Sequence, residues 1–426
     1  MTQTDVDARD DVAGDDAAMP TVSALKPEGQ HEDAGAREAD WQPLDLGPGG
    51  SRGVARIAEY QRLRAECPVA WASDFGGYWS LMKYKDVAEA ARQHKRFRSG
   101  QVFAAMPGFQ PIPQGTNPPE HTTYRRALNK YFGPARMHAL EPTIRRAASE
   151  QLEPLLERGS ADMVREFASI VPVRGLAALL NLSDGAWIEL LERFEALTAL
   201  QDPAKVSEAV MGTLGEAMTR VVADRRAHPL DPDTDLVSGV LEMKVDGESL
   251  SDDAVAAIGV QIFAAGHGTT TDGMSGCLYH LATSPDDQAA LRRDPSLIPD
   301  AIEEFLRLEP SGHEFTRHAT EDVEIRGCPI SSGDLVALNI ASANRDEDEF
   351  PHAGACIIDR KPNRHLSFGN GVQKCLGAPL ARLELRVALE ELLRQTKAIT
   401  LDGPAVEVSA FYFLGGFTSL PVRLHT

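Results

Sequence analysis

A glycine-rich loop around one cysteine is the feature that most constrains this chain. It reads Phe368-Gly369-Asn370-Gly371-Val372-Gln373-Lys374-Cys375-Leu376-Gly377 and runs into Ala378-Pro379-Leu380. Gly369, Gly371 and Gly377 are expected to adopt backbone angles closed to other residues and to leave room for a flat group beside the loop. Pro379 suits a first helical turn, so the Cys375 sulfur would precede a helix N-terminus, whose dipole favours a negative charge. The alternative for Cys375 alone is a small buried hydrophobe.

Three more patterns accompany this loop. The stretch Asn117-Pro118-Pro119-Glu120 opens a helix at a Pro-rich turn and places His121 and Arg125 four residues apart, on one face. The apolar segment from Ser251 to about Ser284 predicts a long helix with a serine cap. Glu304-Phe305-Leu306-Arg307 puts an acid and a base on one helical face. Each pattern is common by itself, and an exposed pair of this kind contributes only about 0.3 to 0.5 kcal/mol.

Together, and in this order across residues 42 to 426, these passages resemble the cytochrome P450 family of haem-thiolate monooxygenases. The resemblance implies that Cys375 is the axial ligand of the iron in haem b, because a thiolate pushes electron density that favours cleavage of the O–O bond. Phe368, Gly369 and Ala265 would lie beside the haem. It also implies a mainly α fold with a small β portion, in which residues 41–426 form a single haem domain.

The resemblance assigns roles to basic residues. His121, Arg125 and Arg317 would contact the haem propionates, since an arginine fork suits a carboxylate. Without the resemblance, each of these three basic residues would be interpreted as a surface charge. Gln373 stands where the family often has His or Arg, so that contact becomes a neutral hydrogen bond.

A further arginine, Arg360, stands where the family places the third member of a buried triad. Glu304, Arg307 and Arg360 would then have a structural role, locking the core behind the haem.

The long helix departs from the family in one position. Ala265, Gly266 and Thr269 match the family's oxygen-handling motif, but Gly268 occupies the place of an acid. The family's acid–threonine pair organises delivery of two protons during oxygen activation. Thr269 can order water, whereas Gly268 cannot relay a proton.

Several replacements for the missing acid stay open. His267 has an unperturbed pKa in the useful range, but it lies about 100° around the helix from Gly268, and a packed or surface histidine is the alternative. The other routes are a water chain through the space beside Gly268, an acid from another segment such as Glu314, or poor coupling with peroxide release.

The expected substrate pocket draws on three segments. The loop from Gln101 to Ile112 carries Phe103, Met106 and Phe109, and the C-terminal turn carries Phe413 and Leu414, where the chain resembles the camphor-hydroxylase branch. On the long helix, Gln261 and Ala265 lie about one turn apart, and Gln261 could bind a ketone or hydroxyl. Core packing is the alternative for the aromatic residues.

Two function classes follow. The first is a monooxygenase that hydroxylates a small apolar molecule, a terpenoid or norisoprenoid, with O2. The second, which Gly268 keeps open, is a haem-thiolate protein that uses peroxide or binds and senses ligands.

Electron supply requires a partner, because no flavin or nicotinamide domain remains beside the haem domain. The resemblance implies a ferredoxin and an NADH-linked ferredoxin reductase. Basic residues flank the cysteine side of the chain, and Arg126 and Lys130 are the hypothesised docking residues for an acidic ferredoxin. Ordinary solvated helix surface is the alternative. We expect a monomer.

Bulk properties agree with a soluble enzyme in a reducing cytoplasm, and the resemblance implies a soluble bacterial origin. The formal net charge of -20 argues against binding to nucleic acid or to an anionic membrane. Residues 1–40 hold eleven acids against three Lys or Arg, which predicts a disordered acidic tail rather than a signal peptide. The uncharged run 254–271 favours a buried helix over a membrane span. Five cysteines without paired zinc-type spacing fit a reducing compartment.

Periodicity predicts a mostly helical chain with a small sheet. The expected helices are Val54–Cys67, Asp86–His94, Pro119–Phe132, Ala135–Arg158, Val206–Arg226 and Ser251–Ser284. The expected strands are Tyr78–Met82, Val323–Ile325 and Leu335–Leu338.

Overall fold

The computed structural model describes residues 52–72, 74–200, 202–245, 247–408 and 413–426. The expected acidic tail at residues 1–40 lies outside this part of the chain. The described residues confirm a mainly helical fold with a small β portion.

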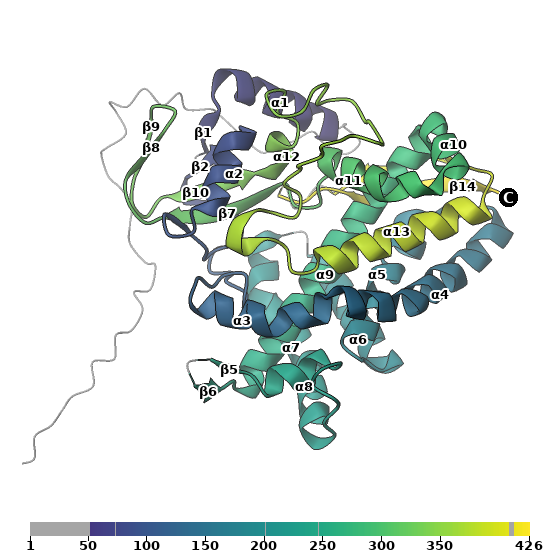
Figure 1. Cartoon of the computed structure of the whole chain (residues 1–426), viewed down its shortest axis with the longest axis horizontal. Coiled ribbons are helices and arrows are strands. Elements are labelled where there is room, and N and C mark those ends of the chain that lie inside the picture. Colours follow the sequence, from purple (N-terminus) through teal and green to yellow (C-terminus); the bar gives the residue numbers. More distant parts are fainter. Residues whose placement is uncertain (1–51, 73, 201, 246, 409–412) are drawn as a thin grey trace, which may run out of the picture. The chain divides into compact units, whose positions relative to one another are not determined.

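A five-stranded sheet stands at one end of the molecule (Figure 1). Its order is β1-β2-β10-β7-β3, and β10 runs parallel to β2 while the other pairings are antiparallel. The strands are β1 Val69–Ala72, β2 Tyr78–Leu81, β10 Leu335–Asn339, β7 Glu314–Ala319 and β3 Phe97–Arg98. Helices α1 (Arg52–Glu66) and α2 (Tyr84–Arg92) and the short α12 (Ile340–Ala343) pack beside it. Apolar residues from α1, β1 and β2 form a core cluster of their own on one sheet face.

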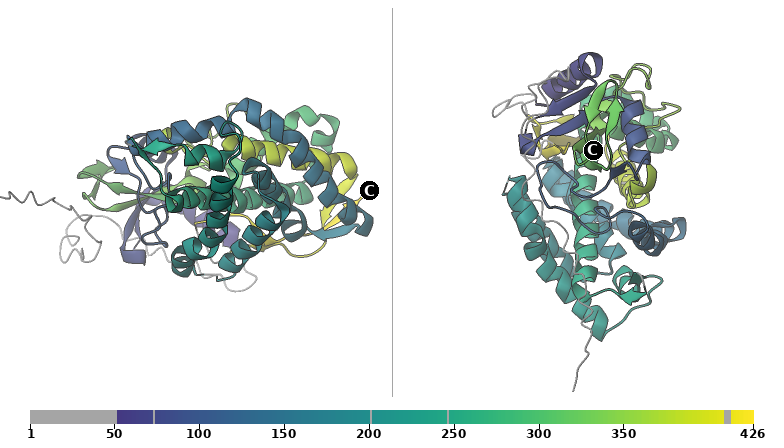
Figure 2. Two further views of the ribbon diagram at one scale, coloured as in Figure 1. Left: turned by 90° about the horizontal axis from the view of Figure 1, so that it is seen from below. Right: turned by 90° about the vertical axis from the view of Figure 1, so that its left-hand side faces the viewer.

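Helices make up most of the rest of the molecule (Figures 1 and 2). They are α3 Glu120–Leu128, α4 Pro134–Arg158, α5 Ile170–Leu179, α6 Asp184–Thr198, α7 Pro203–Ala227, α8 Leu236–Leu241, α9 Asp252–Thr283, α10 Pro285–Arg293, α11 Ile298–Leu308 and α13 Ala378–Gln395. Helix α9 is the centre of this packing, because it contacts α5, α7, α8, α10, α11 and α13. Its Ser251 cap accepts a hydrogen bond from the Ala254 N–H, as expected.

Short strands complete the fold. A three-stranded sheet joins β11 (Ala398–Leu401), β14 (Pro421–His425) and β4 (Ser160–Asp162). Three two-stranded pairs are β5 (Lys244–Val245) with β6 (Glu248–Ser249), β8 (Val323–Ile325) with β9 (Cys328–Ile330), and β12 (Val406–Glu407) with β13 (Phe417–Ser419).

The sequence-based elements lie within a few residues of the observed ones, but several helices were missed. Helix α5 is buried along most of its length and therefore lacks the one-sided pattern that marks a surface helix. Helices α6, α8 and α10 were likewise not predicted, and of α11 only the turn Glu304–Arg307 was expected to be helical. The run 254–271 is part of buried α9, and among the described residues no helix is long and apolar enough to cross a membrane.

Candidate active site

The cysteine loop is held by its own backbone. The Cys375 N–H donates to the Phe368 carbonyl at 2.8 Å, and Gly369 and Gly371 have φ of 70° and 69°. A Cβ at Gly371 would lie 2.5 Å from the Ala91 carbonyl oxygen, so only glycine fits. Gly377 was expected to need backbone angles closed to other residues. This prediction was wrong, because its φ of -79° is open to any residue.

The Cys375 sulfur lies in a recess. The residue as a whole is exposed to solvent, although protein surrounds the thiol closely enough that burial raises its pKa. The pKa of the thiol is lowered, against this effect, by the N–H groups of Gly377 and Ala378 and by the Arg125 guanidinium. These N–H groups belong to the start of α13, so the sulfur does precede a helix N-terminus.

Three basic side chains gather near this recess. His121 is buried, its Nε2 has no partner among the described residues, and burial together with Arg125 lowers its pKa to about 4. Burial lowers the pKa of Arg317 to about 10, and its guanidinium donates to the Thr316 carbonyl at 2.7 Å. Among the described residues no ion pair neutralises Arg125 or Arg317, although Arg125 donates to the Lys374 carbonyl at 2.7 Å. The cluster is therefore suited to an anion.

Gln373 does not face an open space. Its Nε2 donates to the Thr116 carbonyl at 2.9 Å. It therefore ties the cysteine loop to the segment before α3.

The structure brings the three triad residues together behind the loop. Arg307 donates to both Glu304 carboxylate oxygens, at 2.7 and 2.9 Å, and Arg360 Nε lies 3.0 Å from each of them. All three side chains are buried. Arg307 also donates to the carbonyls of Asn344, Ala353 and Ala355, which fixes the loop after α12.

The middle of α9 opens onto an internal space. Between Ala254 and Ala282, all of which are described, Ala265 is the one exposed residue. Neighbouring elements pack around this helix, so an exposed residue at its centre faces inward. Thr269 Oγ1 donates to the Ala265 carbonyl at 2.6 Å, which leaves the hydroxyl's lone pairs free to accept from water.

His267 lies among aromatic rings instead. Its ring is 4.9 Å from that of Phe194 and 6.0 Å from that of Phe263, and burial lowers its pKa to about 4. This environment favours the packed-histidine alternative over a proton relay. Phe194 also covers Gly268, where a Cβ would lie 3.0 Å from the ring.

Glu314 lies on β7, where it pairs with Asn339 of β10. Its carboxylate accepts from Ser80 Oγ of β2 at 3.2 Å, among residues packed against α1, and burial raises its pKa to about 7. Nothing connects it to Thr269 in the described contacts.

The expected pocket residues of the 101–112 loop and of the C-terminal turn come together in one cluster. It contains Ala105, Met106 and Phe413, with Phe103, Phe109, Val206, Val408 and Leu414 packed against them. A further pocket candidate, Gln261 of α9, donates from Nε2 to Gln114 Oε1 at 2.8 Å. Gln114 was not anticipated, because nothing in its local sequence marks it.

Comparison with known proteins decides the family. Residues 173–408 match the family described as Cytochrome P450. The chain is 35% identical over 394 residues to mycinamicin IV hydroxylase/epoxidase of Micromonospora griseorubida, covering 87% of this chain and 96% of that protein. The chain belongs to the cytochrome P450 family. It is also 30% identical over 398 residues to cytochrome P450-terp of Pseudomonas, covering 85% of this chain and 92% of that one.

Solved P450 structures share the fold. Mycobacterium marinum CYP268A2 in complex with pseudoionone superposes with a TM-score of 0.80 at 30% identity, covering 87% of this chain and 95% of that chain. CYP109E1 of Bacillus megaterium in complex with testosterone gives a TM-score of 0.77 at 28% identity, covering 87% and 99%.

This P450 is a haem-thiolate monooxygenase that uses haem b, O2, a substrate and a redox partner. The geometry fits that cofactor. Cys375 would supply the thiolate from its recess, His121, Arg125 and Arg317 would hold the propionates, and Ala265 would leave room over the ring. Bound haem supplies the redox chemistry that splits O2 with two electrons.

One acid that sequence reasoning missed is Asp272. It lies on α9 one turn beyond Gly268, is half-buried, and burial raises its pKa well above the usual range. A Cβ at Gly416 would lie 3.0 Å from its Oδ1, so the carboxyl faces the C-terminal turn. The i, i+4 spacing from Gly268 was the signal that could have found it.

Proposed function

We propose that this P450 hydroxylates an unactivated C–H bond of a small, mostly apolar molecule of the terpenoid or norisoprenoid class. The observation that carries the proposal is the apolar cluster in which Phe103, Met106 and Phe413 meet. The reaction is RH + O2 + 2 e⁻ + 2 H⁺ → ROH + H2O.

The Gln261–Gln114 pair supports a substrate with one polar group. Both side chains keep a further N–H after their shared hydrogen bond. A ketone or hydroxyl oxygen of the substrate could accept a hydrogen bond from such an N–H, while the rest of the substrate contacts apolar side chains. The relative from M. marinum binds pseudoionone, which is a branched unsaturated ketone.

Proton supply is the second part of the proposal. Ser311 Oγ donates to the Thr269 carbonyl at 2.6 Å, and the Ser311 carbonyl accepts from the Gly415 N–H at 2.9 Å. Asp272 contacts the next residue of that turn, Gly416. We therefore assign Asp272 as the acid that takes over from position 268, and burial, which raises its pKa well above the usual range, favours its protonated form. Thr269 would position the water that carries this proton.

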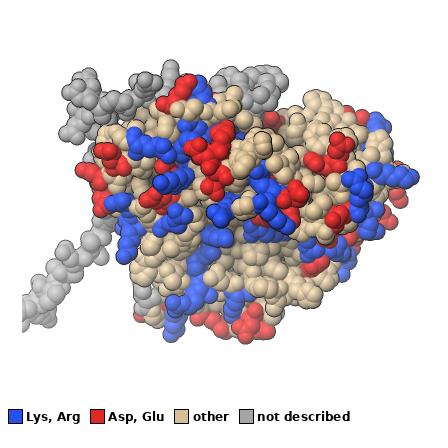
Figure 3. All heavy atoms as spheres, turned by 45° about the horizontal axis from the view of Figure 1, so that its top comes forward, with Lys and Arg blue, Asp and Glu red and all other residues tan. Residues whose placement is uncertain are grey.

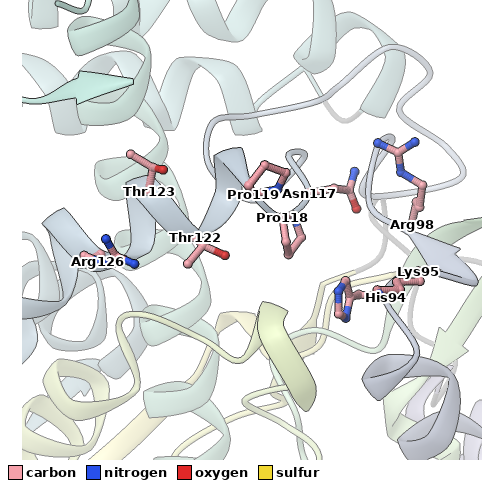
Figure 4. Close-up of a pocket in the computed structure, with 9 residues that line it drawn as sticks. All are labelled: His94, Lys95, Arg98, Asn117, Pro118, Pro119, Thr122, Thr123 and Arg126. Carbon is pink, nitrogen blue, oxygen red and sulfur yellow. The ribbon is translucent and has the colours of Figure 1, made fainter. Parts of the chain in front are cut away.

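Electrons would come from an acidic ferredoxin reduced through an NADH-linked reductase. An open hollow of about 600 Å³ lies between the end of α2 and the start of α3 and is shown in Figure 4. Its lining includes His94, Lys95, Arg98 and Arg126 and no carboxylate. Charges of both signs are mixed over the face in Figure 3, so an acid-free basic hollow offers a specific docking point.

Lys130 is a weaker docking candidate than Arg126. Its ammonium group is 2.8 Å from the Asp233 carboxylate, and that carboxylate would screen it from a partner. Arg126 lines the hollow and forms no ion pair with the described residues.

Peroxide-driven oxidation is the second candidate function. Thr269 is hydrogen-bonded to Ala265 and Ser311, and neither residue carries an ionisable side chain. If Asp272 does not deliver protons, peroxide would supply the oxygen atom and take the place of O2 and the two electrons. We also propose a monomer working in the cytoplasm, a reducing compartment in which disulfides rarely form.

The test is oxygenated product per NADH consumed, with purified protein, a surrogate ferredoxin chain and an ionone, and a peroxide-driven sample beside it. Near-stoichiometric product supports the monooxygenase and its proton route. NADH consumption that yields only peroxide, together with product in the peroxide arm, supports the second candidate. Absence of product in both arms contradicts the substrate class.

A further inference from the structure

Three side chains of the types that bind metals lie together where α9, α10 and the loop after α12 meet. His280 lies in the last turn of α9, Asp287 in the first turn of α10, and Cys356 in the long loop between α12 and α13. One potential ligand atom from each lies within 4.8 Å of the other two. All three side chains are partly exposed, so a cation from solvent can reach them.

The donor set is nitrogen, oxygen and sulfur, which is the combination that zinc takes in proteins. His280 Nε2 and Asp287 Oδ2 are 2.7 Å apart, as in a shared-proton hydrogen bond. In a tetrahedral zinc site with bonds of about 2.0 to 2.3 Å, neighbouring ligand atoms are about 3.3 to 3.8 Å apart. Binding would thus replace the shared proton with the metal and require side-chain movements of about 1 Å or less for the two closest groups.

The positions of these ligands are fixed by their neighbours. The His280 ring packs against Phe305 of α11, with ring centroids 4.5 Å apart. Beside Cys356, the Ile357 N–H donates to Glu304 Oε1 at 2.9 Å, so the buried triad anchors the loop that carries the thiol. Ligands held by packing and hydrogen bonds in this way form a preorganised site.

We propose that His280, Asp287 and Cys356 bind one zinc ion, with water as the fourth ligand. The ion would connect the end of α9, the start of α10 and the loop that leads to Arg360. It would therefore brace the segment behind the haem without touching the haem or its substrate.

The thiol of Cys356 is protonated at neutral pH in the absence of a cation. Burial raises its pKa to about 12, helped by the negative charges of Asp287 and Glu304 and opposed by Arg307 and Arg360. Zinc must therefore displace this proton, as it does at other cysteine ligands.

The test uses the haem-loaded protein, in which Cys375 would be held by iron and would not compete for zinc. After equilibrium dialysis against Zn²⁺, we expect one zinc per chain in the wild type. Cys356→Ser and His280→Gln should each weaken retention at least tenfold, as removal of a direct ligand does. X-ray absorption at the zinc edge should show one sulfur at about 2.3 Å beside nitrogen and oxygen at about 2.0 to 2.2 Å.

Cys328→Ser is the matched control, because its partly exposed thiol lies on β9 at the opposite end of the molecule (Figure 1). It should retain zinc as the wild type does. No retained zinc in the wild type, zinc without a sulfur neighbour, or equal retention in wild type and Cys356→Ser would each overturn the proposal. If Cys356→Ser does not fold, His280→Gln carries the same comparison.

Discussion

The rings of Phe103 and Phe413 stack with their centroids 4.2 Å apart and their planes at 22°. One ring belongs to the loop before α3 and the other to the C-terminal turn, which are separated by most of the chain. This contact joins the two segments that were expected to form the substrate pocket.

Phe413→Ala should weaken binding of an ionone about tenfold, because the substitution removes apolar contact area and one aromatic partner. The spectral shift of the haem on substrate titration measures the dissociation constant. Val406→Ala is the control, since Val406 is 50% exposed and lies outside the cluster. Equal affinity in both variants would assign Phe413 to core packing alone.

Asp272→Asn should lower the product formed per NADH severalfold and raise peroxide release, because an amide cannot supply the proton. Gly268→Asp in the same protein should restore part of the coupling, provided the Phe194 ring shifts to admit the new side chain. Product and peroxide are quantified in the same reaction. Unchanged coupling in Asp272→Asn would exclude this acid from the proton route.

Thr269→Ala should increase the share of electrons lost as peroxide at least severalfold. The substitution removes the hydroxyl that is bonded to the Ala265 carbonyl and that would position water. Thr269→Ser is the control that keeps the hydroxyl and should stay near the wild-type value. Similar peroxide yields from both variants would remove the hydroxyl from the mechanism.

Arg126→Glu should slow reduction by an acidic ferredoxin about tenfold at low salt, and the difference should shrink as ionic strength rises. Lys130→Glu should have a smaller effect, because the lysine is already paired with Asp233. Stopped-flow reduction of the ferric protein at several salt concentrations gives both rates. Equal rates for wild type and Arg126→Glu would place the docking surface elsewhere.

Glu304→Gln should destabilise the protein by about 3 to 5 kcal/mol, because Arg307 and Arg360 would be left buried without their counter-charge. Thermal unfolding and the haem content of the purified protein measure the loss. Glu66→Gln is the control, since its exposed pair with Arg62 contributes little. Wild-type stability in Glu304→Gln would contradict a structural role for the triad.

The sequence was most informative where a function depends on local backbone. The glycines around Cys375 could be recognised because Gly369 and Gly371 need positive φ, and α9 could be placed from its serine cap and long apolar run. The absent acid at Gly268 was also visible at once, since it is a fact about one position. The resemblance to the P450 family then connected these motifs, because they follow one another along the chain in the order that the family has.

Contacts between distant segments were decided by tertiary packing. Gln261 meets Gln114, Asp272 faces the turn at Gly416, and Cys356 lies beside His280 and Asp287, although cysteine spacing gave no sign of a metal site. The physical reason is that a sequence pattern indicates on which face of its own helix or strand a residue lies. Which residue stands opposite depends on how helices and loops pack, and that packing brings together side chains up to hundreds of positions apart.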